Sequence, residues 1–184
     1  MALKATIFKA ELQIADMDRG LYADHALTLA RHPSETDERM MVRLLAFALY
    51  VPANDEAGSL VFAKGMWDPD EPELWQKDLT GRIVHWIEVG QPDERRLLKA
   101  ASRADRVSVL AFGSSVPIWW AAIAGKLART RHLDVWQLPA AQAQALVGLT
   151  QRSMRLQVTV QDGVAWVGDG SQSVEVTPQR LAGG

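Results

Sequence analysis

Between residues 82 and 151, segments with the pattern of buried strands alternate with segments that have the pattern of helices. Short apolar runs bounded by turn residues are typical of strands, whereas longer runs with a polar side are typical of helices. The expected strands are 82–90, 106–113 and 132–138, and the expected helices are 92–104, 117–130 and 139–151. Such alternation predicts a sheet with helices on its faces.

Both ends of the chain have the pattern of antiparallel hairpins. Residues 2–15 alternate in polarity, and residues 25–32 could form the hairpin partner. Near the other end, two alternating runs flank Gln161-Asp162-Gly163, where Asp-Gly is a preferred type I′ turn pair. A last strand is expected at 172–177. The predicted fold class is therefore α/β (α+β), with one mixed central sheet flanked by helices and antiparallel hairpins at both termini.

A helix that ends near Tyr50 has a strong start signal. Ser34 is a favourable N-cap residue, and acidic residues fill the first turn. Residues 59–65 are expected to form a short strand, and residues 71–78 a helical turn or two.

Composition limits the class of protein. The 184 residues contain no recognisable repeat or long linker, which predicts a single domain over residues 1–184. The absence of cysteine excludes disulfides and thiolate metal sites. No signal-like apolar segment or membrane-length apolar run occurs, so a monomeric cytoplasmic protein without membrane contact is expected. With a net charge of −2, nucleic-acid binding would need a local basic patch.

Glu88 stands near the end of the strand expected at 82–90, where both faces are largely apolar. An ionised carboxylate in such surroundings costs several kcal/mol unless it is paired, protonated or bound to a metal. Ligand crevices in open α/β sheets form at the carboxyl ends of such strands. Glu88 is thus either a functional group or a structural one, paired with Arg82 or with a helix N-terminus.

Glu38 is a second candidate. At 100° per residue, it shares a helix face with Val42, Leu45 and Leu49, so it is expected to point inward. Glu35 falls at the edge of this face, where it could pair with Arg39. First-turn acids also stabilise a helix through its dipole, which offers a purely structural alternative.

Asp70 and Asp78 precede the strand and could supply a further carboxylate, although acids in polar connections are usually only solvated. Carboxylates that converge from a helix and a strand suit magnesium or manganese. Such a metal could position a water molecule and neutralise a transferring phosphate.

Basic residues recur at four-residue intervals on the helix expected at 92–104. Arg95, Lys99 and Arg103 could contact nucleic-acid phosphates, although a solvated helix face is the commoner explanation.

Several long blocks of the sequence resemble the bacterial YaeQ family. They include "LTLARHPSETDERMMVRLLAFAL", "EPELWQKDLTGRI", "HWIEVGQPDERRLLKA" and "MRLQVTVQDGVAWVGD", and the resemblance covers essentially the whole chain. It implies a restriction-endonuclease-like fold, regarded as a divergent variant of the PD-(D/E)xK nucleases.

The nuclease pattern can be carried over residue by residue. It assigns the helix acid to Glu35 or Glu38, the strand acid to Glu88, and the preceding aspartate to Asp78 or to Asp70. Glu88 and the aspartate would then hold magnesium or manganese.

The pattern's lysine is missing, because Gly90 stands two residues after Glu88. Gln91, Lys64 and Lys99 are the candidates to replace it. Losing one preorganised donor can lower a rate by a factor of about 10²–10³. Two functions are therefore expected from this resemblance: a magnesium-dependent phosphodiesterase acting on nucleic acid, or an inactive module that binds nucleic acid or a protein.

Overall fold

The computed structural model describes residues 4–183, which form two compact units. The first unit comprises the described part of residues 1–48 together with 139–178, and the second comprises 49–138 together with 179–183. Two mixed sheets and four α-helices confirm the expected α+β class, although the strands divide between two sheets and do not form a single central one. The expectation of one domain stays a prediction. Within residues 4–183, no helix has the length and apolar character needed to cross a bilayer.

The first unit contains a five-stranded sheet in the order β10-β9-β8-β1-β2. Its strands are β1 (Thr6–Asp16), β2 (Leu21–Arg31), β8 (Ser153–Gln161), β9 (Val164–Gly168) and β10 (Ser173–Val176). β1 and β2 form an antiparallel hairpin, and β1 pairs with β8 in parallel. Both expected terminal hairpins therefore belong to one sheet. The turn between β8 and β9 has positive φ at Asp162 and Gly163, as the type I′ prediction requires.

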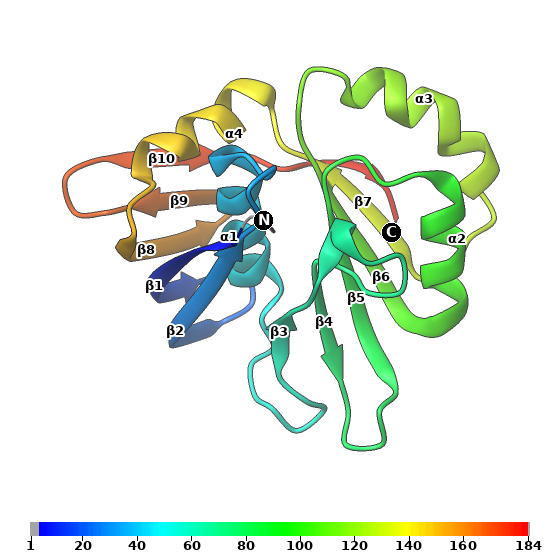
Figure 1. Cartoon of the computed structure of the whole chain (residues 1–184), viewed down its shortest axis with the longest axis horizontal. Coiled ribbons are helices and arrows are strands. Elements are labelled where there is room, and N and C mark those ends of the chain that lie inside the picture. The colour runs from blue at the N-terminus through cyan, green and yellow to red at the C-terminus, as the bar shows by residue number, and fades with distance from the viewer. Residues whose placement is uncertain (1–3, 184) are drawn as a thin grey trace. The chain divides into compact units, whose positions relative to one another are not determined.

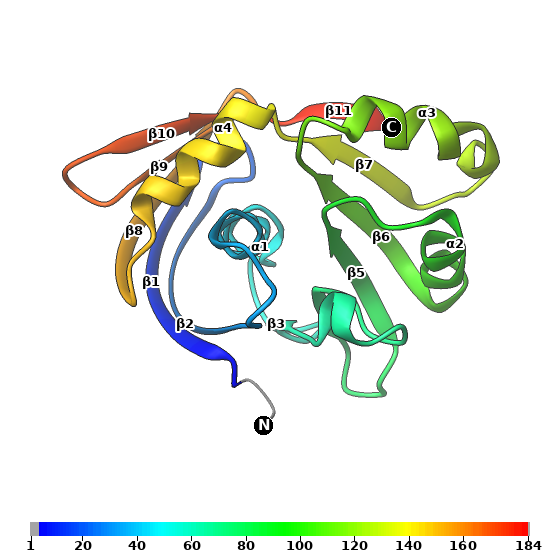
Figure 2. The ribbon, with the colours of Figure 1, turned by 45° about the horizontal axis from the view of Figure 1, so that its top comes forward.

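This sheet curls around α1 (Asp37–Tyr50), which Figure 2 shows nearly end-on inside the curve. Every residue from Met40 to Ala48 is buried, as expected for a helix enclosed on all sides. The alternation of β1 directs Phe8, Leu12 and Ile14 into the core. α4 (Ala140–Ala145) and a 3₁₀ helix (Leu146–Leu149) complete the unit.

The start of α1 differs from the expectation. Thr36, not Ser34, caps the helix, because its Oγ1 accepts a hydrogen bond from the backbone N–H of Arg39. Ser34 instead bonds to Nδ1 of His32.

The second unit contains a six-stranded sheet in the order β11-β7-β6-β5-β4-β3. Its strands are β3 (Leu60–Phe62), β4 (Leu74–Lys77), β5 (Ile83–Val89), β6 (Ala104–Ala111), β7 (Leu133–Gln137) and β11 (Gln179–Ala182). The central strands β5, β6 and β7 are parallel, and the others are antiparallel to their neighbours. The alternation predicted from the sequence is thus confirmed for residues 83–137.

α2 (Glu94–Arg103) and α3 (Val116–Leu127) cover one face of this sheet (Figure 1). Their residues Leu97, Ile123 and Leu127 pack with Trp86 and Val109 in one buried cluster. Asp93 caps α2 by accepting a hydrogen bond from the N–H of Arg96. The side chains that alternate with the cluster on β5, β6 and β7 therefore lie on the opposite face.

One expected element was wrong. Residues 71–78 were predicted as a helical turn, but β4 occupies Leu74–Lys77 and pairs with both β3 and β5. Leu74 and Gln76 are buried, while Lys77 is exposed. β11 was not expected at all.

Candidate functional site

Glu88 lies near the end of β5, on the face covered by α2, and only 2% of its surface is exposed. Its Oε1 accepts hydrogen bonds from Nε1 of Trp86 at 2.8 Å and from Nε of Arg96 at 2.7 Å. Burial raises the pKa of the Glu88 carboxyl to about 7, although the charge of Arg96 and the bond from Trp86 both oppose that rise. The strand acid is therefore one half of a buried ion pair, which is the structural alternative, but with Arg96 as partner.

Arg96 also binds the chain between β3 and β4, here called the 64–73 loop. Its Nη1 donates to the carbonyl oxygen of Asp68 at 3.1 Å, and its Nη2 donates to those of Gly65 and Glu71. The guanidinium thus joins β5, α2 and the loop. Because its guanidinium forms hydrogen bonds to both β5 and the loop, Arg96 fixes the geometry around Glu88.

Two further residues of α2 hold the same loop. Lys99 forms an ion pair with Asp70, and Nη1 of Arg103 donates to the carbonyl oxygen of Asp70 at 3.0 Å. The guanidinium of Arg103 also lies 5.3 Å from the ring centroid of Trp86. Of the three residues expected to contact nucleic acid, Lys99 and Arg103 therefore have loop partners, while Arg95 is exposed on α2.

Glu73 is a carboxylate that the sequence analysis missed. It is 2% exposed, its N–H donates to the carbonyl oxygen of Ile87, and its charge contributes to the raised pKa of Glu88. Leu74 pairs with Ile87 in the ladder, so Glu73 comes opposite Glu88. Counting residues back from the Asp78–Arg82 turn would have placed Glu73 opposite Ile87, because the register shifts by one residue between Gln76 and Lys77. The pair was therefore not predictable from the sequence, even with 74–77 assigned as a strand.

Asp78 lies at the other end of β5 from Glu88. It forms the turn into β5, where Oδ1 accepts from Thr80 and from the N–H of Arg82, and these bonds, led by that of Thr80, lower its pKa. At about 3.3 Å per residue, the rise from Arg82 to Glu88 amounts to roughly 20 Å. The structure does not bring the two expected metal ligands together.

The residues that could replace the missing lysine also have structural contacts. Lys64 starts the 64–73 loop, with Nζ 3.7 Å from a carboxylate oxygen of Asp68. The amide of Gln91 donates to the carbonyl oxygen of Phe112 and to Oγ of Ser115, which ties the end of β5 to the β6–α3 connection. Lys99 is paired with Asp70, as described above.

Glu35 and Glu38 lie in the first unit. The carboxylate of Glu35 is buried and accepts from Nη1 of Arg39 at 2.7 Å and from Nη2 of Arg43 at 2.6 Å, so the expected pair with Arg39 is confirmed. Glu38 is half-buried, and burial raises its pKa. The helical wheel assigned the inward direction to Glu38, but Glu35 is the more buried acid.

The acids do not assemble a site that fits magnesium or manganese. Across residues 4–183, no group of three or more His, Asp or Glu side chains is arranged to hold a metal ion. Glu73 and Glu88 form a pair, but a guanidinium already neutralises Glu88. Magnesium prefers octahedral oxygen ligands. No catalytic step through a metal therefore follows from this geometry.

A second polar cluster lies on the opposite face of the same sheet. Ser108 is fully buried, and its Oγ lies 2.7 Å from Nε2 of His85 and donates to Oδ1 of Asp134 at 2.9 Å. Tyr50 also forms a side-chain hydrogen bond with Ser108. Burial and the charge of Asp134 raise the pKa of the Tyr50 hydroxyl. Burial and the charge of Arg106 lower the pKa of His85 to about 3.

This cluster is not a hydrolytic triad, although it contains serine, histidine and aspartate. In a triad the aspartate orients the histidine, which accepts the proton of the serine. Here the hydroxyl of Ser108 donates its one proton to Asp134. Ser108 must therefore accept from His85, so Nε2 of the neutral imidazole is the donor. The cluster therefore satisfies buried polar groups, and His85 is not arranged as a general base for Ser108.

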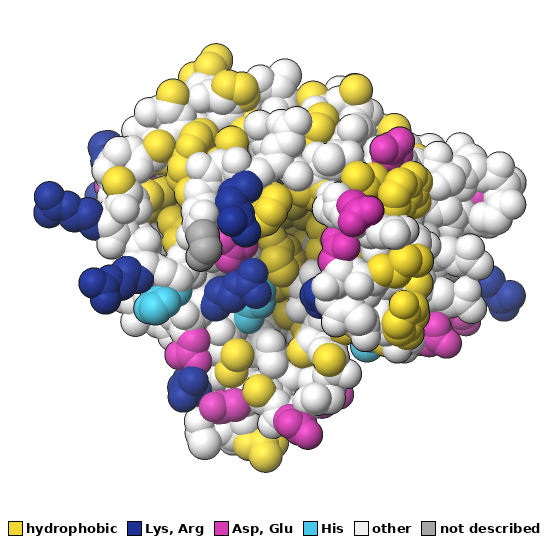
Figure 3. Space-filling view, turned by 180° about the vertical axis from the view of Figure 1, so that it is seen from behind, with side chains coloured by type: hydrophobic (Ala, Val, Ile, Leu, Met, Phe, Trp, Pro, Cys, Tyr) yellow, Lys and Arg dark blue, Asp and Glu magenta, His cyan; other side chains and the backbone are white. Residues whose placement is uncertain are grey.

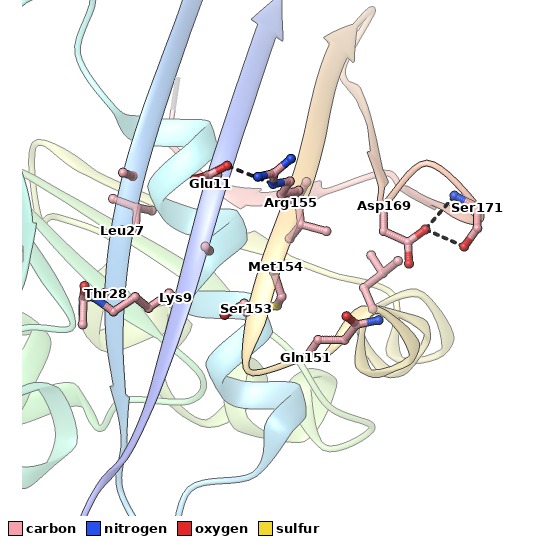
Figure 4. A pocket seen from close by; sticks show the side chains of 14 residues that line it. Lys9, Glu11, Leu27, Thr28, Gln151, Ser153, Met154, Arg155, Asp169 and Ser171 are labelled. Atoms are coloured by element: carbon pink, nitrogen blue, oxygen red, sulfur yellow. Dashed lines mark hydrogen bonds and ion pairs between the residues drawn. The ribbon is translucent and has the colours of Figure 1, made fainter.

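A groove of about 650 Å³ crosses β2, β1 and β8 in the first unit (Figure 4). Its charged side chains largely bind one another or their own turn: Arg155 lies 3.2 Å from Glu11, and Asp169 accepts from Ser171. Lys9 also lines the groove and is exposed, but a single surface ammonium does not point to a ligand class.

The fold defines a mixed α+β protein in which the acid near the end of the central strand β5 forms a buried ion pair with an arginine of α2. Sequence comparison places it more narrowly: the model of the YaeQ protein family matches residues 1–178, and the chain belongs to this family.

Its relatives share nearly their whole length with it. The "Uncharacterized protein YaeQ" of Salmonella typhi is 46% identical over 177 residues, which cover 96% of this chain and 95% of that protein. The protein of the same name from Escherichia coli K12 is 45% identical over 177 residues, with the same coverage.

Crystal structures agree with the fold. The YaeQ protein from Xanthomonas axonopodis pv. citri superposes with a TM-score of 0.91 at 47% identity, covering 98% of this chain and 99% of that one. The YaeQ protein from Pseudomonas syringae superposes with a TM-score of 0.90 at 39% identity, covering 98% and 97%.

Proposed function

We propose that this YaeQ-family protein binds nucleic acid without cleaving it. The observation that carries the proposal is the ion pair between Glu88 and Arg96, in which the expected catalytic acid already has a buried cationic partner. Because Arg96 also donates to three backbone carbonyls, releasing Glu88 for a metal would break the attachment of the 64–73 loop as well.

Basic groups support the binding part of the proposal. Arg95 is exposed on α2, and Lys99 and Arg103 remain at the surface although they hold the loop. Arginine and lysine that neutralise phosphates release counterions, so such binding weakens steeply with salt. The net charge of −2 confines this contact to a local surface.

A magnesium-dependent phosphodiesterase is the second candidate. It is favoured by the position of Glu73 opposite Glu88, since two adjacent carboxylates are a common part of such sites. This function requires the 64–73 loop to leave Arg96 and the two acids to become accessible.

One experiment separates the two functions. Purified parent protein and the Glu88→Ala variant are incubated with single- and double-stranded DNA and RNA, with magnesium or manganese, and binding is measured in parallel over a range of salt. Salt-sensitive binding without cleavage supports the proposal. Cleavage by the parent that Glu88→Ala abolishes establishes the second candidate instead. If no nucleic acid is bound or cut, both fail, and a protein partner becomes the function to test.

A matched pair of variants locates the contact on α2. Arg95→Gln removes an exposed positive charge from α2, whereas Arg155→Gln removes one from β8 in the first unit, where the side chain is 88% exposed. Weaker binding by Arg95→Gln alone assigns the contact to α2.

A further inference from the structure

A groove of about 580 Å³ lies in the second unit where β6, β7 and β11 are adjacent. It is on the sheet face opposite α2 and α3, because Arg106, Asp134 and Trp136 alternate with residues of the cluster that packs against those helices. Arg180 pairs with Trp136 in the ladder and so shares this face. A volume of this size is in the range of small-molecule sites.

One wall of the groove is an aromatic ring covered by a guanidinium. The guanidinium carbon of Arg180 lies 4.8 Å from the ring centroid of Trp136. Nε1 of Trp136 donates to Oδ2 of Asp134 at 3.2 Å, which fixes the orientation of the indole. Aromatic rings and guanidinium planes are the groups on which unpaired bases stack.

The acids of the groove are already neutralised. Asp134 is paired with Nε of Arg106 at 3.1 Å, and Asp105 is paired with Arg82. The side chain of Arg106 is 53% exposed, and among residues 4–183 its Nη atoms donate to no protein acceptor. Arg106 thus keeps donors that can reach a ligand.

Further basic residues are neighbours in the chain of Thr130 and His132, which line the groove. Arg129 and Arg131 are exposed in the connection between α3 and β7, and His132 follows them. Figure 3 shows dark-blue basic side chains gathered near a cyan histidine over the part of the second unit that holds α3 and β7. Arg106 balances Asp134 and Arg82 balances Asp105, so the charge of Arg180 makes the groove net positive.

His132 has an unusual backbone conformation. Its φ of 62° lies in the left-handed region, which few residues other than glycine adopt, and its carbonyl oxygen accepts a hydrogen bond from the N–H of Val107. Such conformations persist where the surrounding structure enforces them, and they concentrate at functional sites. This one places an imidazole at the rim of the groove.

We infer that this groove binds one nucleotide unit of single-stranded nucleic acid, with the base against Arg180 and Trp136 and the phosphate at Arg106 and His132. The inference rests on the proposed function and adds to the α2 contact a second surface, which binds one base with its phosphate on the opposite face of the sheet. A double helix fits poorly, because its bases are stacked on one another and present only their edges. A free nucleotide has the same chemistry and is the other source of such a ligand.

The test measures binding of a fluorescent twelve-residue oligothymidylate, the same strand annealed to its complement, and AMP. Arg180→Gln should weaken single-strand binding at least fivefold, since base stacking is worth about 1–3 kcal/mol per base. Arg155→Gln, the equal charge change in the first unit, should change it less than twofold. The indole N–H resonance of Trp136, assigned with Trp136→Phe, should shift on titration with the single strand.

Each result has one meaning. If Arg180→Gln binds the single strand as tightly as the parent, and only Arg95→Gln binds it more weakly, the groove is not the binding site. The proposed function then still stands. AMP binding that Arg180→Gln weakens, without binding of any strand, keeps the groove as a nucleotide site and overturns the proposed function. Absence of binding by the parent overturns both. A duplex bound as tightly as the single strand overturns the stacking geometry.

Discussion

Nε of Arg96 donates to Oε1 of Glu88 across 2.7 Å, in a place where only 2% of Glu88 is exposed. The side chain of Arg96 is 17% exposed, so the pair is nearly closed to water. Breaking a buried pair by removing one partner leaves an uncompensated charge.

Arg96→Met is therefore expected to lower the free energy of unfolding by roughly 3–5 kcal/mol at pH 8, where Glu88 is ionised. Urea denaturation measures the loss. Arg95→Met on the exposed side of the same helix is the control, with an expected change within about 0.5 kcal/mol. The double variant Glu88→Met/Arg96→Met should recover much of the stability, and equal midpoints for the parent and Arg96→Met would contradict the assignment.

The pKa of Glu88 predicts how stability depends on pH. Burial raises this pKa from 4.5 to about 7, so between these values the folded protein holds a proton that the unfolded chain has lost. The Glu88 contribution to stability is therefore complete below about pH 4.5 and falls as the pH rises through 7.

Denaturation of the parent and Glu88→Gln at pH 5 and pH 8 isolates this contribution. The parent should lose more stability than the variant between the two pH values, by up to roughly 3 kcal/mol. Parallel pH profiles would show that Arg96 keeps Glu88 ionised throughout.

Gly65 and Gly20 provide a matched test of the 64–73 loop. Their φ angles are 65° and 64°, so alanine is strained equally at both positions, at a cost of roughly 1–2 kcal/mol. A Cβ at Gly20 would meet nothing within 4 Å, whereas one at Gly65 would lie 2.2 Å from the buried carboxylate of Glu73. Gly65→Ala should therefore destabilise by a further 1–3 kcal/mol or so, as overpacking does. Equal melting temperatures for the two alanine variants would mean that the Glu73 carboxylate moves freely.

His85 is expected to stay neutral well below neutral pH. Burial and the charge of Arg106 lower its pKa to about 3 from 6.5, so in this interval the unfolded chain binds a proton that the folded protein does not. This group therefore contributes stability above pH 6.5 and loses it as the pH falls toward 3. NMR spectra of the imidazole, assigned with His85→Gln, should show the Nε2–H tautomer down to pH 4. A titration midpoint between pH 5 and 7 would refute the buried network around Ser108.

The strands and helices from residue 83 to 137 were predictable because apolar spacing is a local property of the chain. The Asp162-Gly163 turn was predictable for the same reason, since positive φ demands those residue types. β4 was not: Leu, Gln and Lys favour helices when taken alone, but here β3 and β5 supply ladder partners on both sides. That error and the register shift between Gln76 and Lys77 together concealed the position of Glu73 opposite Glu88.

The directions of the Glu35 and Glu38 side chains could not be predicted for a different reason. A helical wheel assumes one buried face and one exposed face. Residues 40–48 are buried on every side, so the apolar positions do not tell which way Glu38 points. Glu35 precedes α1, and its direction is set by Arg39 and Arg43. Likewise, nothing local indicates that Arg96 reaches Glu88 or that Arg180 covers Trp136.

The parallel pairing of β1 with β8 has a consequence for biosynthesis. Lys9 faces Ser153 in that ladder, and β11 completes the other sheet only at residues 179–182. A ribosome must therefore synthesise the chain as far as β10 before the first sheet is complete and as far as β11 before the second is. Until β8 has been synthesised, one edge of β1 lacks its neighbouring strand. Nascent chains are exposed to aggregation until these strands have been synthesised, and removing residues 153–182 would leave both sheets incomplete.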